Sequence, residues 1–504
     1  MTLPCLVGLA GTRLGAGERR LLAELRPAGV LLFRRNVRDA EQLASLCGEL
    51  LELLGDDETD PILAADHEGG AVSVLETAVG APPSALALGL AGKPELTRAV
   101  HRETGRRARS VGVNLLLAPV ADVVPGANRV LSTRSFGSTA AAVGRHVQAA
   151  IAGLHDAGVA ACAKHWPGHG RPLADSHLEL PRNDATLEEL MRLELPPFVE
   201  AFEAGAECVM VGHLAVPALD ATARLASCSS VIVEEWLRGR LEFSGMILSD
   251  ALEMSAFSEA PAACLEAGCD LVLLADPIES QEVVLRALGE SRPRPGGLAR
   301  LAAFRTTLRQ TRREDRGASE GEGAYLQARR EGVSVLWPET SEMPPWPLAR
   351  GSRPSWSLLD AASADRLVRS PADGALRVDV AASASRLAPR IEAGLGPPSA
   401  PTLLLPPPGQ GGFASIRCAA AVDPLDLVFL ASLRPFSDAE WALIEPRLNA
   451  KCAIVLLGDL SAERRLPHDR GVLLVPGVRE ADIDVAVGLL KGSIPAARRG
   501  RWGD

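Results

Sequence analysis

Eight short apolar runs alternate with amphipathic segments over residues 3–275 of this 504-residue chain. The runs are nearly continuous rather than alternating, which is typical of parallel strands that are covered on both faces. We predict strands at Leu3–Leu9, Gly29–Phe33, Ile62–Asp66, Gly112–Val120, Val159–Lys164, Cys208–His213, Gly245–Asp250 and Asp270–Ala275. The helical segments between them include Glu41–Leu54, Glu95–Ser110, Thr186–Ala204 and Ser230–Leu241.

This alternation predicts an α/β fold of the (β/α)8 TIM-barrel type, whose usual length is about 250 residues. The same alternation also permits an open, doubly wound sheet. We favour the barrel because polar clusters follow nearly every strand, as expected where strand ends converge around one mouth.

A charged, glycine-rich stretch, RREDRGASEGEG, follows the barrel and is typical of a linker. Beyond it, apolar runs and helical patterns predict a smaller α/β layered, sandwich-like domain with a parallel sheet. Its predicted strands are Val333–Trp337, Thr402–Leu405, Asp426–Ala431, Ala453–Leu457 and Val472–Val475, and its helices are Asp438–Leu448 and Glu480–Leu490. We therefore expect a catalytic barrel at residues 1–312, a linker at 313–330 and a C-terminal domain at 331–504.

Composition argues against several classes of function. The net charge of −10 gives no basic footprint for nucleic acid, and no apolar run reaches the ~18–20 residues of a membrane span. The nine cysteines are scattered singly without a CxxC pair, which fits reduced thiols. No basic residue precedes the apolar N-terminal stretch, as it does in a secretory leader. We expect a cytoplasmic protein with a small-molecule substrate and neither a nucleic acid nor a membrane partner.

Polar residues gather where the predicted strands end. Because such ends meet around one pocket in a barrel, these clusters predict an active site. They are Asp66–Gly70, Asp122 with the loop Thr133–Gly137, Lys164–Gly170 with the loop Asp175–His177, His213, and Ser249–Ala251.

Histidines in these clusters permit metal-assisted hydrolysis as one interpretation, because neutral imidazole is a common zinc ligand. They are His67, His165, His169, His177 and His213. Against this interpretation, Trp-Pro-Gly separates His165 from His169 and would break the helix that a zinc pair at that spacing needs. We therefore expect no metal and no organic cofactor, and keep a metal-dependent barrel hydrolase as an alternative.

Glycoside hydrolysis with a carboxylate nucleophile is the second interpretation. A retaining mechanism needs one carboxylate under the anomeric carbon and one proton-transfer group beside the leaving oxygen. Asp250, held at a strand end, has the fixed placement of a nucleophile. His177, on a longer loop, can supply and take back a proton near neutrality, and Asp175 can accept a hydrogen bond that sets its tautomer.

The string AKHWPGHG, followed by DSH and LELP, resembles the signature of the NagZ-type β-N-acetylglucosaminidases of glycoside hydrolase family 3. Further similarities in the same order are GVLLFRRNV, DHEGG, APVADV, TRSFG, MVGHLAVPALD and GMILSDALEM, and they extend from about residue 6 to residue 276. The segment GVSVLWPE also resembles the start of the second, layered domain of many members. The resemblance therefore covers most of the barrel.

This resemblance implies an exo-acting, retaining enzyme that removes terminal β-linked N-acetylglucosamine (GlcNAc) from muropeptide fragments or chitooligosaccharides. It assigns the nucleophile to Asp250 and the acid/base to His177, with Asp175 as its partner. It also assigns sugar binding to Asp66, Arg134, Lys164 and His165. We interpret Asp122, His169 and His213 as structural supports of the loops.

Several positions depart from the family pattern. Val74 occupies the place of an arginine that normally contacts the sugar, Arg171-Pro172 replaces Asp-Thr, and Ala251 replaces the second aspartate of SDD. Losing one charged hydrogen bond to a sugar costs about 1.5–3 kcal/mol. A catalytically weakened sugar-binding protein is therefore a further alternative, and Arg171, Arg34 or a residue of the second domain are candidates to replace the missing contact.

Overall fold

The computed structural model describes residues 2–125, 128, 131–171, 181–254, 261–290, 295–313 and 322–331, and beyond these only strands between residues 334 and 501. Its contacts divide the chain into two compact units. The barrel unit comprises Met1–Pro82, Lys93–Pro125 and Ser135–Ala324, and the second unit comprises Pro83–Gly92, Gly126–Arg134 and Tyr325–Asp504. The predicted boundaries at 1–312, 313–330 and 331–504 stay a prediction.

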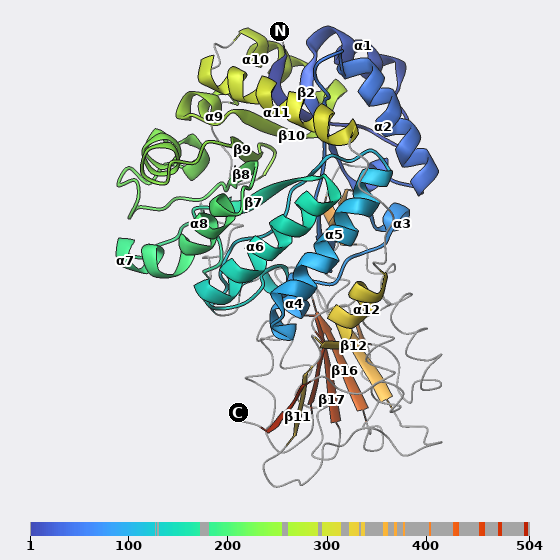
Figure 1. Ribbon diagram of the computed structural model, residues 1–504, viewed down its shortest axis with the longest axis vertical. Coiled ribbons are helices and arrows are strands. Elements are labelled where there is room, and N and C mark those ends of the chain that lie inside the picture. Colours follow the sequence, from blue (N-terminus) through green and yellow to red (C-terminus); the bar gives the residue numbers. More distant parts are fainter. Residues whose placement is uncertain are drawn as a thin grey trace. The chain divides into compact units, whose positions relative to one another are not determined.

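Eight strands of the barrel unit close into a barrel, which confirms the predicted fold class (Figure 1). Pairing between β1 and β10 closes the ring, so the alternative of an open sheet is wrong. All neighbouring strands are parallel. The strands are β1 (Leu3–Gly8), β2 (Pro27–Leu32), β3 (Ile62–Ala65), β6 (Leu115–Leu116), β7 (Ala160–Trp166), β8 (Cys208–Val211), β9 (Met246–Ala251) and β10 (Leu271–Pro277).

The predicted strand at Gly112–Val120 is regular only as β6. Pro119 lies just beyond β6, and proline has no N–H for a ladder bond. The chain nevertheless stays beside β7, because Ala121 N donates to the Lys164 carbonyl at 2.7 Å. The barrel therefore remains closed while its fourth strand leaves regular pairing early.

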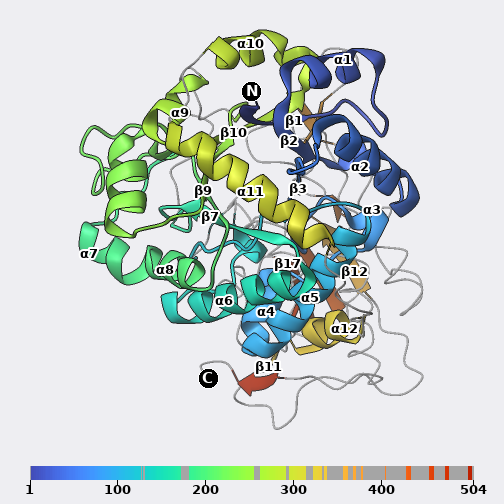
Figure 2. The ribbon, with the colours of Figure 1, turned by 45° about the horizontal axis from the view of Figure 1, so that its top comes forward.

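Helices surround the barrel, and all of those named here except the four-residue α3 bury apolar residues. Among them, α2 and α5 match the predicted segments closely, and the side chain of Asp39 caps α2 by accepting from Gln42 N. Helix α11 runs across the barrel end where the strands begin, and its Phe304 and Leu308 belong to the core cluster (Figure 2). These helices are α1 (Ala16–Leu25), α2 (Ala40–Leu54), α3 (Glu76–Val79), α5 (Pro94–Ser110), α6 (Ala140–Ala157), α8 (Pro196–Glu203), α9 (Ala262–Ala267), α10 (Glu282–Glu290) and α11 (Pro295–Arg313).

The segment predicted as one helix at 186–204 is divided into three parts. Helix α7 (Leu187–Glu189) passes into a π-helical turn, η3 (Leu190–Glu194), and α8 follows. Pro196 and Pro197 lack the N–H groups that an uninterrupted α-helix would use there. Leu195 N instead donates to the Leu190 carbonyl, five residues back, at 2.9 Å. A second π-helix, η5 (Val231–Arg240), occupies the predicted segment 230–241.

The second unit contains a seven-stranded sheet in the order β15-β12-β16-β17-β18-β11-β19. All of its pairs are parallel except β11 with β18. The five strands predicted beyond the linker are present as β11 (Ser334–Trp337), β15 (Leu403–Leu404), β16 (Leu427–Ser432), β17 (Ala453–Gly458) and β18 (Val472–Val475). The sequence analysis missed β12 (Trp356–Asp360), the hairpin β13 (Leu367–Arg369) and β14 (Leu376–Val378), and β19 (Arg498–Arg501). The helices predicted at 438–448 and 480–490 lie outside the described residues.

Two further helices complete the description. Helix α4 (Ala85–Ala91) belongs to the second unit and is capped by Ser84. Helix α12 (Glu322–Glu331) occupies part of the predicted linker. None of the helices that the structure describes is long and apolar enough to cross a membrane.

Candidate active site

Four of the predicted site residues stand where barrel strands end. Asp66 directly follows β3, Lys164 and His165 lie in the last half of β7, and Asp250 is the penultimate residue of β9. Arg134 belongs to the second unit, where it ends a short turn, η2 (Ser132–Arg134). Asp175 and His177 lie outside the described residues, as do all of residues 172–180.

Lys164 joins two carboxylates at the mouth of the barrel. Its Nζ lies 2.6 Å from Asp66 Oδ1 and 2.6 Å from Glu68 Oε1. The Lys164 and Glu68 side chains are almost fully buried, whereas the Asp66 side chain is 28 % exposed. The sequence analysis did not single out Glu68, although it stands in the DHEGG motif directly after the strand. Lys164 thus keeps a buried carboxylate neutralised and holds a second one at the rim.

A small hairpin positions Asp66. Strands β4 (His67–Gly69) and β5 (Val72–Ser73) pair antiparallel, and Val74 N donates to the Asp66 carbonyl at 3.0 Å. Val74, where the family pattern has a sugar-contacting arginine, therefore closes the hairpin through its backbone. Its side chain offers no polar atom to a substrate.

Asp122 organises the loop that follows β7. Its Oδ2 accepts from His165 Nδ1 at 2.7 Å and from His165 N at 3.1 Å, and its Oδ1 accepts from His169 N at 2.7 Å. Burial alone would raise the pKa of the Asp122 carboxyl, but the His165 ring, His169 and these hydrogen bonds together lower that pKa. A buried, ionised Asp122 therefore fixes both the ring of His165 and the backbone of the loop, in agreement with the supporting role predicted for it.

Asp250 presents a carboxylate to the same end of the barrel. It is half-buried, and its Oδ1 accepts from Ala251 N at 2.8 Å. Its Oδ2 has no hydrogen-bond partner in the described part of the chain. Burial lowers the pKa values of His169 and His213, and the negative charge of Asp250 partly offsets this lowering. The backbone amide of the next residue thus orients the Asp250 carboxylate, and its role as nucleophile stays a prediction.

His213 supports the strand end that carries Asp250. Its Nδ1 lies 2.8 Å from Ser227 Oγ, and its Nε2 lies 3.1 Å from the Ala251 carbonyl. A carbonyl only accepts, so Nε2 carries the proton and Nδ1 accepts from the Ser227 hydroxyl. Burial lowers the pKa of His213, which favours this neutral form. The contact fixes the backbone directly after Asp250.

The two arginines considered as replacements for the missing sugar contact are both engaged in ion pairs. Arg171 Nε lies 2.5 Å from Glu194 Oε1, and Arg34 NH1 lies 3.2 Å from Glu76 Oε2. Replacement of the sugar contact by either residue stays a prediction. Among the residues that the structure describes, no group of three or more His, Cys, Asp or Glu side chains could hold a metal ion.

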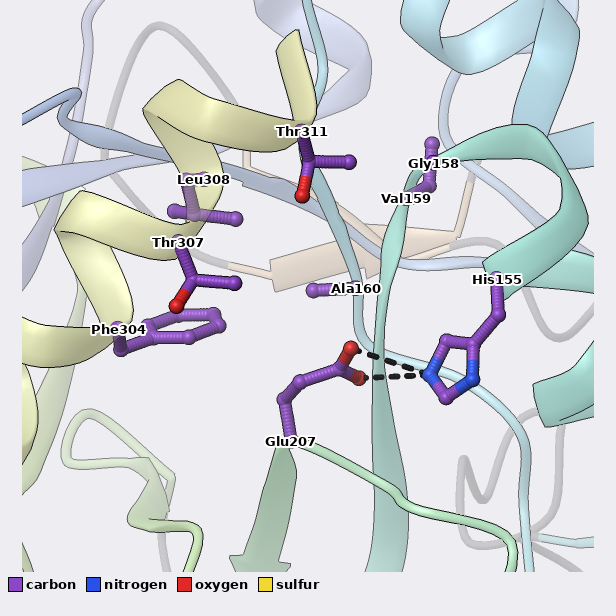
Figure 3. Close-up of a pocket in the computed structure, with 9 residues that line it drawn as sticks. All are labelled: His155, Gly158, Val159, Ala160, Glu207, Phe304, Thr307, Leu308 and Thr311. Atoms are coloured by element: carbon purple, nitrogen blue, oxygen red, sulfur yellow. Dashed lines mark hydrogen bonds and ion pairs between the residues drawn. The ribbon is translucent and has the colours of Figure 1, made fainter. Parts of the chain in front are cut away.

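A cavity of about 160 Å3 opens at the opposite end of the barrel (Figure 3). Its lining includes Val159 and Ala160 at the start of β7, Glu207 just before β8, and Thr307 on α11. Figure 3 shows Glu207 facing His155, whose Nε2 is 3.1 Å from the carboxylate. None of the predicted site residues lines this cavity. Residues at this end of a TIM barrel usually serve stability rather than catalysis.

Comparison with known proteins gives matches over the barrel and over the whole chain. The profile of the family described as "Glycosyl hydrolase family 3 N terminal domain" matches residues 7–290. A β-hexosaminidase from Thiobacillus denitrificans is 39% identical over 316 residues, which are 60% of this chain and 86% of that protein. A second β-hexosaminidase, from Methylococcus capsulatus, is 35% identical over 308 residues, 59% of this chain and 90% of that protein.

Two solved structures show the same relationship in three dimensions. The glycoside hydrolase family 3 β-N-acetylglucosaminidase from Paenibacillus sp. str. FPU-7 matches with a TM-score of 0.80 and 27% identity, covering 98% of this chain and 96% of that chain. NagZ from Neisseria gonorrhoeae, in complex with N-trifluoroacetyl-D-glucosamine, matches with a TM-score of 0.54 and 30% identity, covering 64% of this chain and 93% of that chain. The first match therefore extends well beyond the barrel.

Proposed function

The chain belongs to glycosyl hydrolase family 3 and is a glycoside hydrolase, and we propose that it is an exo-acting, retaining β-N-acetylglucosaminidase. Its substrates are small carbohydrates that end in β-linked GlcNAc. Two relatives that this chain matches over most of their length are named β-hexosaminidases. The NagZ structural neighbour is in complex with an N-acylated glucosamine. The single observation that supports this proposal best is the set of charged residues at one end of the barrel, with Asp250 near the end of β9 and the Lys164–Asp66 ion pair at the ends of β7 and β3.

In the proposed mechanism, Asp250 attacks the anomeric carbon through its free oxygen. The glycosidic bond breaks as His177 donates a proton to the leaving oxygen, and a covalent glycosyl–Asp250 ester forms. Water then gives a proton to His177 and attacks the same carbon, which releases the sugar and restores the carboxylate. Asp175 orients His177 and stabilises its protonated ring. The two displacements give net retention, and no metal or cofactor takes part.

The groups around Asp250 serve binding and orientation. The partly exposed Asp66 carboxylate and the Lys164 ammonium can hydrogen-bond hydroxyls of the terminal sugar. Asp122 accepts from Nδ1 of His165, which leaves its Nε2 for a further hydroxyl. Arg134 is proposed as a fourth sugar ligand. Holding the ring in one place turns the attack of Asp250 into an intramolecular step, which is a large part of the rate enhancement in such enzymes.

A muropeptide fragment of peptidoglycan recycling is the natural substrate that we propose, with short chitooligosaccharides as the alternative outcome. The proposed location is the cytoplasm. The cysteines that the structure describes support this location, since all of them are buried thiols.

A panel of nitrophenyl β-GlcNAc, β-glucoside and β-xyloside tests the proposal. The predicted result is a strong preference for the acetamido sugar, unchanged in EDTA. Equal rates on all three sugars would contradict the substrate assignment, and loss of activity in EDTA that zinc restores would favour the metal-dependent alternative.

A second candidate function rests on Val74. Because no arginine contacts the sugar there, the protein could bind GlcNAc without turning it over. Calorimetric binding of GlcNAc with no hydrolysis over a long incubation would establish this candidate in place of the first.

A further inference from the structure

Arg171 forms an ion pair at the start of the segment that carries the proposed acid/base. It is the last described residue before 172–180. Its Nε lies 2.5 Å from Glu194 Oε1, and its NH2 lies 3.6 Å from Glu189 Oε1. Pro172 follows directly and restricts Arg171 to extended backbone. Both the side chain and the backbone of this residue are therefore constrained.

Glu194 is an unusual partner, because its side chain is completely buried. It stands at the end of the π-helical turn η3, and its Oε2 has no hydrogen-bond partner among the described residues. Burial raises the pKa of Glu194, and the adjacent Arg171 opposes that rise. A buried carboxylate without a cation is strongly unfavourable. Arg171 is thus the cation that opposes the cost of burying the Glu194 carboxyl.

Residues on both sides of 172–180 pack around Gly168, which lies against Glu194. A Cβ added to Gly168 would lie 2.8 Å from Glu194 Cβ, so the backbone passes directly over Glu194. On the far side, Asn183 Nδ2 donates to the Gly168 carbonyl at 3.2 Å, and Ala215 N donates to the Pro181 carbonyl at 2.8 Å. The Arg171–Glu194 pair therefore belongs to a small, tightly packed stem from which the segment departs and to which it returns.

An ordinary surface ion pair in the same barrel provides a contrast. Arg98 and Asp156 join α5 to α6 at 2.8 Å, with side chains that are 56 % and 30 % exposed. Exposed ion pairs of this kind contribute little to the free energy of unfolding. The Arg171–Glu194 pair differs because one partner is buried and because its arginine stands six residues before His177 in the chain.

We propose that Arg171 is a positioning residue: by pairing with Glu194 it fixes the start of the segment that bears Asp175 and His177, and so sets how well His177 protonates the leaving group. The proposal rests on the proposed function, and in particular on the acid role of His177. It also assigns a role to the Arg-Pro that stands where the family pattern has Asp-Thr. A small misplacement of a proton-transfer group costs as much as about a hundredfold in rate, so the pair can affect catalysis without touching the substrate.

The test compares two β-GlcNAc glycosides, one with a dinitrophenyl leaving group that departs without protonation and one with a methyl leaving group that needs it. Arg171→Met keeps the apolar stem and removes the charge. We expect kcat/KM to fall at least about tenfold for the methyl glycoside and less than about threefold for the dinitrophenyl glycoside. The basic limb of the pH profile, where His177 loses the proton that it donates, should change for the methyl glycoside alone. Arg171→Lys, which retains the charge, should restore part of the loss.

The double variant Arg171→Met/Glu194→Gln separates positioning from stability. It removes the uncompensated buried charge, so the melting temperature should recover. If Arg171 positions the segment, the selective loss on the methyl glycoside should persist. Equal losses on both substrates, or recovery of methyl-glycoside turnover in the double variant, would show a purely structural role and overturn the proposal.

Arg98→Met is the matched control and should leave both substrates unchanged. The wild-type enzyme reports separately on the underlying function. Failure of the wild type to cleave either glycoside would refute the proposed activity, and this inference with it. A wild type that cleaves both, with variants that show no difference between substrates, would refute the inference alone.

Discussion

The carboxylate of Asp122 accepts from both the ring and the backbone of His165, at 2.7 Å from Nδ1 and 3.1 Å from the amide. Two bonds to one residue fix its ring orientation and its tautomer together. Because the same carboxylate also holds His169 N, one buried charge orders the whole loop after β7.

Replacing this carboxylate by an amide should therefore disturb binding and stability together. In Asp122→Asn, the amide NH2 faces a donor, and one of the three N–H groups loses its acceptor, which costs about 1–3 kcal/mol. We expect kcat/KM on nitrophenyl β-GlcNAc to fall at least about tenfold. Steady-state kinetics and urea denaturation measure the two effects. Asp156→Asn on the exposed pair is the control, and an Asp122 variant that behaves like this control would contradict the assignment.

Lys164 should contribute both to stability and to sugar binding, and two variants can separate these contributions. Lys164→Met removes the cation that lies 2.6 Å from the buried Glu68 carboxylate, which costs up to about 3–5 kcal/mol of stability, and it removes a proposed sugar ligand. The double variant Lys164→Met/Glu68→Gln should regain stability without regaining activity. Thermal melting and kcat/KM provide the two readouts, with the exposed Lys93→Met as control. Full recovery of activity in the double variant would show that Lys164 does not bind the sugar.

Acid should destabilise the barrel through two buried histidines. Burial lowers the pKa of His101 on α5 to about 4 and that of His146 on α6 to about 4, from an ordinary value of 6.5. Below pH 6.5 the unfolded chain binds protons that the folded protein does not. The free energy of unfolding should therefore fall as the pH drops toward 4, by about 1.4 kcal/mol per pH unit for each histidine.

Urea denaturation at several pH values checks this slope. His146→Gln can keep a hydrogen bond to Thr97, which contacts the ring at 2.7 Å in the wild type, while removing the titrating group. The variant should show a shallower dependence on pH. Identical slopes for the two proteins would contradict the prediction.

A charge cluster at the opposite end of the barrel should matter for stability alone. Asp270, just before β10, accepts from Arg238 NH2 at 2.5 Å and from Arg300 NH2 of α11 at 2.6 Å. Asp270→Ala leaves two arginines without their carboxylate, and we expect a loss of about 3–5 kcal/mol. The folded variant should keep its kcat/KM at low temperature. A selective loss of activity without loss of stability would contradict the assignment of stability alone to this end of the barrel.

The barrel was predictable because parallel strands that are buried on both faces leave continuous apolar runs in the sequence. Strands β1 and β10 lie at opposite ends of the barrel sequence, yet each carried this signal clearly. Strand β19, with the sequence RRGR, carries no such signal and was missed. The division of residues 186–204 was also missed, because a π-helical turn depends on hydrogen bonds that the apolar spacing does not encode.

The candidate site could be predicted in part. The strand ends predicted the positions of Asp66, Lys164, His165 and Asp250 at the barrel mouth, because such ends converge in a barrel, and the roles of these residues stay a prediction. The partner of Lys164 at Glu68 and the partner of Arg171 at Glu194 depend on burial and side-chain direction, which sequence spacing leaves open. The assignment of Asp175 and His177 stays a prediction, since both lie outside the described residues.

Identification of the residue that bonds to the sugar tests the nucleophile most directly. An activated β-GlcNAc fluoride with a second fluorine on the ring slows breakdown of the glycosyl–enzyme, so that proteolysis and tandem mass spectrometry can locate the label. We predict a sugar ester on Asp250 in the wild type and none in Asp250→Asn. A label on another carboxylate, or turnover that inverts the anomeric configuration, would contradict the account.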